Sequence, residues 1–294
     1  MPVMRFRSVL GILLLAVALP AVAAPSVATT APVDARARPC ARGSALYEYG
    51  TATVIVRSRG HRLRTTVAYP AATSGEGAVP ICRRSPLVIA GHGSQGDGAS
   101  AALLHRYLVE RGYVVAAPTF RSGSYDFDGF ARDVTRTITK VLRASRAGGG
   151  KIGGLVRRHG KVGYIGTSMG AIIGLRLTDR GHRDDRIGAV VAKAGAAFGR
   201  LRTRGAPPVL MMNGDADTTI RYADARETYA DLRRPKGLIT LAGVGHDLNT
   251  RGDPIMVTAS RLFLAHFLRG RDKALAGIVR AARRSEIASL RKRW

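Results

Sequence analysis

The sequence predicts an α/β protein with a doubly wound, mostly parallel sheet that carries helices on both faces. Two observations lead to this prediction. Between residues 86 and 268, short apolar runs of strand character alternate with longer segments of helical periodicity. Polar, glycine-containing loops follow several of the apolar runs, as is usual at the carboxyl ends of parallel strands. With 294 residues, 46% of them hydrophobic, the chain is long enough for one such domain with a full core.

The first 45 residues are expected to lie outside this domain. Residues 1–23 carry two arginines, an apolar run at 9–19 and a small-residue ending, which is the pattern of a secretory signal peptide. The apolar run is too short to span a bilayer comfortably and no later stretch reaches spanning length, so no transmembrane segment is expected. Residues 24–45 are interpreted as a flexible segment. The mature protein is therefore predicted to be secreted, to the extracellular space or the periplasm.

Residues 46–270 are interpreted as the domain itself, opening with an antiparallel strand pair. Strand-prone runs at 51–58 and 63–69 flank a hairpin signal, and Pro70 is expected to stop the second strand. Residues 86–90 form a continuous apolar run, as expected for a strand buried on both faces. Further strands are expected at 113–118, 187–193, 208–212 and 237–242, and a short one in the stretch 160–170 that ends in a Gly-x-Ser-x-Gly motif. Helices are expected at 99–111, 130–144, 171–177, 222–232 and 255–268. The short connector at 195–206 leaves room for only a minimal lid, and residues 271–294 are interpreted as a basic helical tail.

The stretch Gly166-Thr167-Ser168-Met169-Gly170 lies between a buried strand and a helix. A Gly-x-Ser-x-Gly turn in this context is a nucleophile elbow, in which the serine occupies a strained turn and projects from the sheet. The two glycines are expected to leave room where side chains would collide. The start of the following helix favours developing negative charge. Ser168 is thus a candidate nucleophile.

A serine hydroxyl needs a base within hydrogen-bond reach, and the base needs a carboxylate that fixes its tautomer. His246 follows the last expected strand, directly after Gly243-Val244-Gly245, and is the candidate base. Asp215 and Asp217 both follow the strand expected at 208–212 and are the candidate acids; Asp247 is interpreted only as a neighbour of the histidine. The resulting chain order is Ser, Asp, His.

With these motifs, residues 86–268 resemble the α/β-hydrolase superfamily. Within it they are similar to secreted esterases of the dienelactone-hydrolase, platelet-activating-factor-acetylhydrolase and cutinase-like group. The resemblance implies an oxyanion hole formed by the N–H of Met169 and by Ser94, with Gly93 allowing close approach. His92 is implied to be structural. The family pattern Gly-x-x-Asp after the strand expected at 208–212 implies Asp217 as the acid, with Asp215 as a turn residue. No cofactor is expected, and no metal, because the histidines and aspartates form no ligand pattern.

The resemblance implies hydrolysis of a small-molecule or polymeric carboxylic ester through an acyl-enzyme. Gln95, Phe120 and Phe198 are expected to contact the substrate together with Gly93, and Tyr125 and Phe127 are further apolar candidates. The sole tryptophan is Trp294, so the tryptophan that usually follows the serine in polyester hydrolases is missing. A peptidase or acyltransferase using the same triad is the alternative.

Cys40 and Cys82 are predicted to form a disulfide, since both lie in the exported part of the chain; two unpaired buried thiols are the alternative. The net charge of the full chain is +27, and removing residues 1–23 leaves 45 basic residues against 20 acidic ones. This excess is interpreted as general cationic character. Weak adhesion to polyanions or to the cell envelope is the alternative, and with it a non-catalytic surface-binding role. No specific nucleic-acid binding is expected, because aromatic residues do not alternate with the basic ones.

Overall fold

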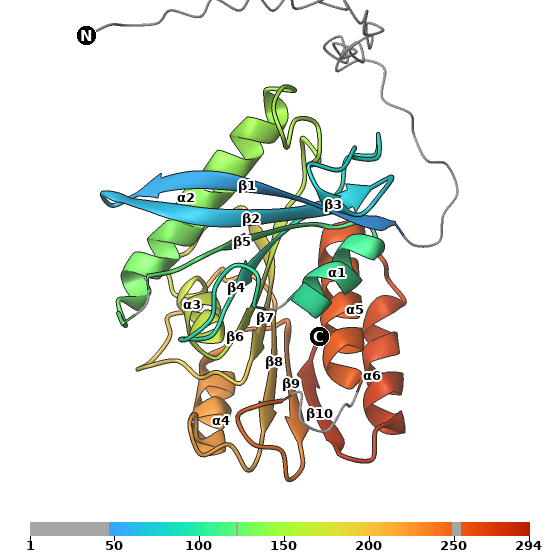
Figure 1. Cartoon of the computed structure of the whole chain (residues 1–294). Helices are drawn as coiled ribbons and strands as arrows, with labels where there is room; N and C mark the ends of the chain where they lie inside the picture. Colours follow the sequence, from blue (N-terminus) through green and yellow to red (C-terminus); the bar gives the residue numbers. More distant parts are fainter. Residues whose placement is uncertain (1–46, 101, 122, 249–253) are drawn as a thin grey trace, which may run out of the picture. The chain divides into compact units, whose positions relative to one another are not determined.

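The computed structural model describes residues 47–100, 102–121, 123–248 and 254–294 (Figure 1). The strands in these ranges are β1 (Glu48–Ser58), β2 (His61–Ala71), β3 (Gly75–Glu76), β4 (Leu87–Gly91), β5 (Val114–Pro118), β6 (Val162–Thr167), β7 (Ile187–Lys193), β8 (Val209–Gly214), β9 (Lys236–Leu241) and β10 (Ala288–Arg293). The helices there are α1 (Ala102–Glu110), α2 (Phe127–Arg146), α3 (Met169–Arg176), α4 (Tyr222–Asp231), α5 (Ile255–Arg269) and α6 (Ala274–Arg284). The predicted signal peptide and the predicted Cys40–Cys82 disulfide involve residues outside the described ranges, and both stay predictions.

All of these strands belong to one mixed sheet with the order β10-β9-β8-β7-β6-β4-β5-β2-β1-β3. The six central strands from β9 to β5 are parallel to one another. At the two ends, β10 pairs antiparallel with β9, and β2 pairs antiparallel with both β5 and β1. The expected α/β class and the antiparallel N-terminal pair are confirmed, and the parallel arrangement holds for the central block.

The β1–β2 hairpin turns through Arg59 and Gly60, which both have positive φ, of 47° and 81°. A two-residue turn of this kind matches the twist of antiparallel strands. The expected end of the second strand at Pro70 is wrong, because Pro70 still pairs with Tyr49 in β1. The ladder between β2 and β5 ends at Ala68, so the missing N–H of the proline interrupts no pairing with β5.

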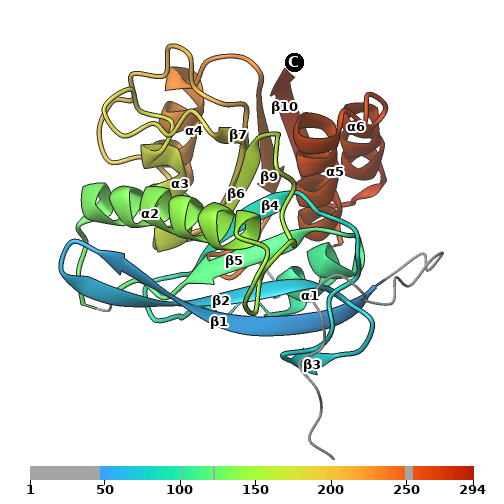
Figure 2. The same ribbon diagram turned by 90° about the horizontal axis from the view of Figure 1, so that it is seen from above.

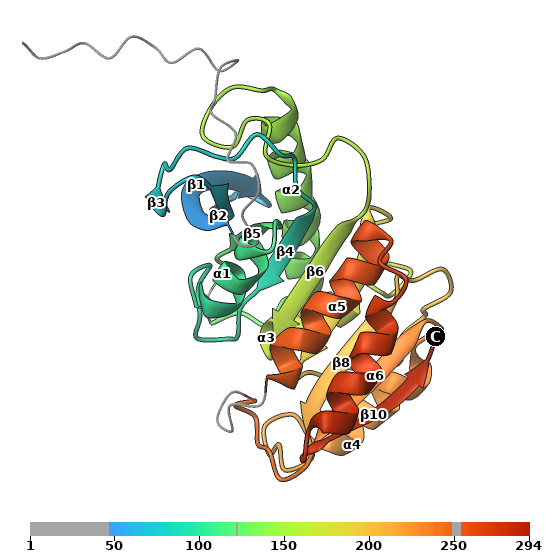
Figure 3. The ribbon, with the colours of Figure 1, turned by 90° about the vertical axis from the view of Figure 1, so that its right-hand side faces the viewer.

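Successive strand residues face two separate cores, as expected for strands buried on both sides. Ile89 and Val190 belong to the core beneath α2, α3 and α4, whereas Val88 and Val191 belong to the core beneath α1, α5 and α6. Figures 2 and 3 show these two helical layers on opposite faces of the sheet. Helices therefore cover both faces of the parallel block.

The expected helical tail at 271–294 is wrong in its second half. It forms α6 and then β10, which pairs residue by residue with β9 from Leu241 to Lys236. Trp294 closes this edge: its ring lies 6.2 Å from that of Phe263, and a Cβ at Gly237 would collide with it. The helix propensity of the basic residues is outweighed because β10 satisfies the backbone groups that β9 would otherwise leave exposed. None of the helices in the described ranges is long and apolar enough to cross a membrane.

Candidate active site

Ser168 occupies a strained turn between β6 and α3. Its φ and ψ are 54° and −120°, a region that residues with a Cβ rarely adopt and that costs about 1–3 kcal/mol. The Ser168 N–H donates to the carbonyl oxygen of Lys193 at 2.9 Å, which anchors the turn to the end of β7. Strain of this kind persists only where the surroundings enforce it.

The two glycines of the motif are required by close backbone approach. A Cβ on Gly166 would collide with the carbonyl of Gly170, and a Cβ on Gly170 would collide with the carbonyl of Gly91. The buried hydroxyl of Tyr164 donates to the Gly170 carbonyl at 2.7 Å. The expectation that Gly166 and Gly170 leave room for the turn is confirmed.

The side chains of Ser168, His246 and Asp217 form one hydrogen-bonded chain. The Ser168 Oγ lies 2.9 Å from His246 Nε2, and His246 Nδ1 lies 2.8 Å from Asp217 Oδ2. The three residues come from loops that follow β6, β9 and β8, so the carboxyl ends of three parallel strands supply them. The structure thus brings together the three residues that the sequence motifs selected.

Asp217 is held so that only one of its oxygens faces the histidine. Its side chain is fully buried, and the backbone N–H groups of Thr219 and Ile220 each donate to Oδ1 at 2.8 Å. A carboxylate accepts hydrogen bonds and cannot donate them, so His246 Nδ1 is the protonated nitrogen. Nε2 is then the acceptor for the Ser168 hydroxyl. Asp215 instead accepts from the Gly243 N–H at 2.7 Å, which fits the turn role expected for it.

The loop after β4 lies against Ser168. A Cβ built on Gly93 would lie 3.7 Å from the Ser168 Cβ, so this loop lies close to the serine; the expected contact of Gly93 with substrate stays a prediction. Met169 is the first residue of α3, and its N–H therefore has no carbonyl in a preceding turn to bind. Ser94 and Gln95 are exposed in the same loop. The expected roles of Met169 and Ser94 as oxyanion donors stay predictions.

His92 fixes the path of this loop. Its Nε2 accepts from the Phe120 N–H at 2.8 Å, and Nδ1 therefore donates to the Gly93 carbonyl at 2.7 Å. Burial lowers the pKa of His92 below its ordinary value, which keeps the neutral ring that this pair of bonds requires. The structural role expected for His92 agrees with these contacts.

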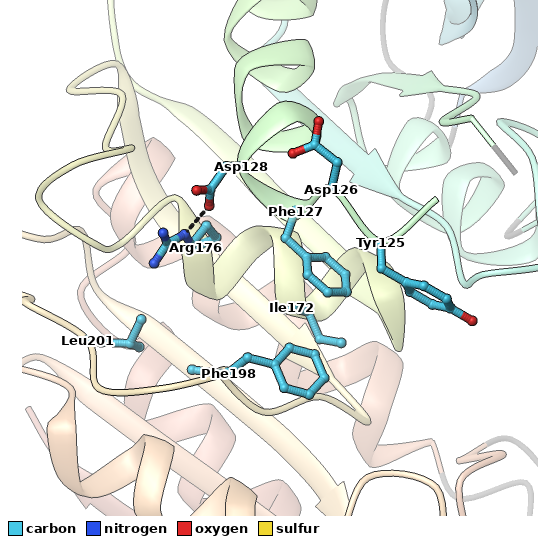
Figure 4. Close-up of a pocket in the computed structure, with 9 residues that line it drawn as sticks. Tyr125, Asp126, Phe127, Asp128, Ile172, Arg176, Phe198 and Leu201 are labelled. Atoms are coloured by element: carbon cyan, nitrogen blue, oxygen red, sulfur yellow. Dashed lines mark hydrogen bonds and ion pairs between the residues drawn. The ribbon is translucent and has the colours of Figure 1, made fainter. Parts of the chain in front are cut away.

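A cavity of about 310 Å³ begins one helical turn beyond the serine (Figure 4). Ile172, whose N–H donates to the Ser168 carbonyl at 3.1 Å, contributes to its wall. Phe127 and Phe198 stack there with ring centroids 5.4 Å apart, and Tyr125 also lines the cavity. The lining set is Tyr125, Asp126, Phe127, Asp128, Ile172, Arg176, Ala197, Phe198 and Leu201.

The two phenylalanines expected to contact substrate differ in exposure. Phe198 is 68% exposed and lines the cavity, as expected. Phe120 is only 2% exposed, because its ring packs between those of His92 and Phe130. Phe120 is therefore a core residue, and the expectation that it lines the pocket is corrected.

Two buried basic side chains, those of Lys193 and His105, were not predicted from the sequence. Burial lowers the pKa of Lys193, at the end of β7, to about 8. The pKa of His105 in α1 falls to about 4, first through burial and second through repulsion by Lys193. The one sequence feature that could have indicated burial of Lys193 is its position at the end of an apolar run. No sequence feature indicated that His105 is buried.

In the part of the chain that the structure describes, no three His, Cys, Asp or Glu side chains group in a way that could hold a metal ion. No protein-family model matches the chain, and no curated protein matches it significantly.

Proposed function

We propose that this protein is a serine hydrolase that cleaves carboxylic esters. The observation that carries the proposal is the hydrogen-bonded chain from Ser168 through His246 to Asp217 on a strained strand-to-helix turn. The order of the three residues along the sequence and the central parallel strands with helices on both faces support an α/β-hydrolase fold. Action outside the cytoplasm, after removal of residues 1–23, is part of the same proposal.

In the proposed reaction, the Ser168 oxygen attacks the acyl carbon of the ester while His246 Nε2 takes the hydroxyl proton. The negative charge that develops on the carbonyl oxygen is stabilised by the N–H of Met169 at the start of α3, with Ser94 as the second donor. As the C–O bond to the alcohol breaks, the alcohol leaves with the proton from His246. Water then attacks the acyl-serine by the same two proton transfers, releasing the acid and restoring Ser168.

Asp217 is proposed to act by position and charge. Because its carboxylate is fixed by the N–H groups of Thr219 and Ile220, it holds the histidine ring in the orientation that directs Nε2 at the serine. Its negative charge also stabilises the imidazolium that forms when His246 accepts the proton. The side chain of His246 is 27% exposed, so the ring remains accessible to the attacking water.

The substrate class proposed for the site is an ester with an apolar acyl or aryl group. Phe127, Phe198 and Ile172 offer apolar surface in a small cavity, and Ile172 lies one helical turn beyond the serine. An apolar group placed there loses contact with water, which contributes about 25 cal/mol per Å² buried. The Ser168 side of the cavity would then hold the scissile carbonyl.

The proposal is tested by turnover of p-nitrophenyl esters from acetate to hexanoate by the mature chain. Wild-type protein and a Ser289→Ala control, altered at an exposed serine of β10, should both hydrolyse the esters. Ser168→Ala should not. Equal turnover by Ser168→Ala and the control, or none by a folded wild-type sample, would remove the proposal.

A further inference from the structure

The β1–β2 hairpin and α2 lie side by side (Figures 1 and 2). Five basic side chains from these segments line recesses at this place. We call this feature the basic groove and define it by Arg57, Arg62, Arg136, Lys140 and Arg143. Two recesses form it, of about 230 and 430 Å³, and Arg57 and Arg136 line both of them. The recesses are therefore adjacent parts of one concave surface.

The cations of the basic groove have no counter-ion among the described residues. Two acids at the N-cap and in the second turn of α2 are engaged by another arginine: Arg59 binds Asp126 at 2.6 Å and Asp133 at 3.2 Å. The remaining acid of α2, Asp128, binds Arg176 at 2.5 Å. Arg57, Arg62, Arg136 and Arg143 are exposed and Lys140 is half-buried, so an anion could reach each of them.

The placement of these cations works against folding. Arg57 and Arg62 are direct partners across the β1–β2 ladder, where like charges are destabilising. Arg136 and Lys140 are four residues apart on α2, and Arg143 follows three residues later, so like charges also repel along one helical face. A local arrangement that costs stability without a compensating contact is typical of a functional surface.

We infer that the basic groove binds a linear phosphate polymer that carries no nucleobases, such as a polyphosphate or a phosphodiester polymer. The row from Arg136 to Arg143 extends about 10 Å along α2, which suits an anionic chain with several charges. Arginine and lysine are the side chains that bind phosphate. This inference does not depend on the proposed hydrolase activity.

The lining of the groove favours such a polymer over two other polyanions. Apart from the imidazole of His61, no aromatic side chain belongs to either recess, so nothing there offers a stacking surface for bases. The cations line recesses and not a flat face. A flat bilayer would therefore contact only the rim of each recess. The groove therefore suits a narrow, flexible chain better than a nucleic acid or a membrane.

The test measures binding of fluorescently labelled inorganic polyphosphate to the mature chain at 50 and 200 mM salt. The groove variant is Arg57→Gln/Arg136→Gln/Lys140→Gln. The matched control is Arg283→Gln/Arg284→Gln/Arg291→Gln, which removes three exposed charges from α6 and β10. Thermal melting of each protein verifies that the variants fold.

We expect the groove variant to lose at least tenfold in affinity at 50 mM salt, and the control less than threefold. The slope of log affinity against log salt should fall by about 2 for the groove variant, since each released contact contributes about 0.7. Equal losses in both variants would show that net charge alone governs binding and would overturn the inference. Tighter binding of a thymidine oligonucleotide or of phosphatidylglycerol vesicles than of polyphosphate would overturn it in favour of those partners.

Discussion

The proposed active site and the basic groove differ in how their charged side chains are compensated by neighbouring groups. At the active site the one acid, Asp217, is buried, and each of its oxygens accepts a hydrogen bond from a named donor. In the basic groove, five cations gather without an acid among the described residues, and two of them face each other across a strand pair. The first arrangement fixes the positions of a few atoms through direct hydrogen bonds. The second creates a field that attracts an anion but positions no single atom.

Single substitutions should therefore have different effects in the two regions. At the active site one atom matters, and removing it should abolish activity without much effect on folding. In the groove the effect is distributed, so several charges must be removed together.

Replacing Asp217 by Asn should lower ester turnover by about 10⁴-fold, because the amide can present its N–H to His246 Nδ1 and so favour the wrong tautomer. The comparison variant is Asp215→Asn, which alters a carboxylate two residues away that binds only the Gly243 N–H in the described contacts. That change should leave turnover within tenfold of wild type. Steady-state kinetics on p-nitrophenyl butyrate measures both. If Asp215→Asn caused the larger loss, the assignment of the acid would be wrong.

Replacing Lys193 by Met should stabilise the fold and flatten its pH dependence. The pKa of this lysine is about 8 in the folded chain against an ordinary value near 10.5, so protonation favours the unfolded state. Stability of the wild type should therefore rise as the pH increases from about 8 to 10.5, and the penalty, of the order of 3 kcal/mol, is fully present below pH 8. His105 is the titratable group that interacts with Lys193, and it is neutral throughout this window.

Urea unfolding of wild type and Lys193→Met at pH 7, 9 and 10 tests this prediction. Lys292→Met, at an exposed position of β10, is the control and should change little. A Lys193→Met protein that is less stable than wild type at pH 7 would show that the ammonium group is paired in the native state.

Replacing Gly166 by Ala should destabilise the fold by about 1–3 kcal/mol and lower activity, since the added methyl group collides with the Gly170 carbonyl. Gly149→Ala is the matched control, because a Cβ there meets nothing within 4 Å and the backbone needs no positive φ. Chemical denaturation measures the difference between them. Equal stabilities for the two variants would show that the turn tolerates a side chain.

Replacing Phe198 by Ala should reduce kcat/KM for hexanoate about tenfold, while the value for acetate changes less, because only the longer acyl chain reaches the ring. Stability should change little, since Phe198 is 68% exposed. Phe120→Ala should do the reverse and cost about 3–5 kcal/mol of stability, as expected for a buried ring. If Phe198→Ala altered neither substrate, the cavity would not be part of the binding site.

The sequence was most informative where local chemistry permits few solutions. The strand at 187–193 was predicted with its observed limits, because a short apolar run between longer helical segments is typical of a strand buried on both faces. The positions of Ser168, Asp217 and His246 were predictable because each follows a strand, and parallel strands bring their carboxyl ends to one edge.

What remained hidden depended on contacts between distant parts of the chain. β10 could not be recognised because its pairing with β9 decides its conformation, whereas its own residues are compatible with a helix. Burial of Phe120 depends on His92 and Phe130, which contact it from other elements. The basic groove could not be predicted from the sequence either, since its cations come from two strands and a helix and lie close together only in the folded chain.

Covalent labelling would show whether Ser168 is the activated nucleophile that we propose. The mature wild-type chain and a His246→Gln variant would be incubated with a fluorophosphonate, digested, and examined by mass spectrometry for the modified peptide. We predict one adduct on Ser168 in the wild type, with labelling slowed at least 100-fold in His246→Gln because the serine loses its base. An adduct on another residue, or equal labelling rates in the two proteins, would contradict the assignment of Ser168 as a nucleophile activated by His246.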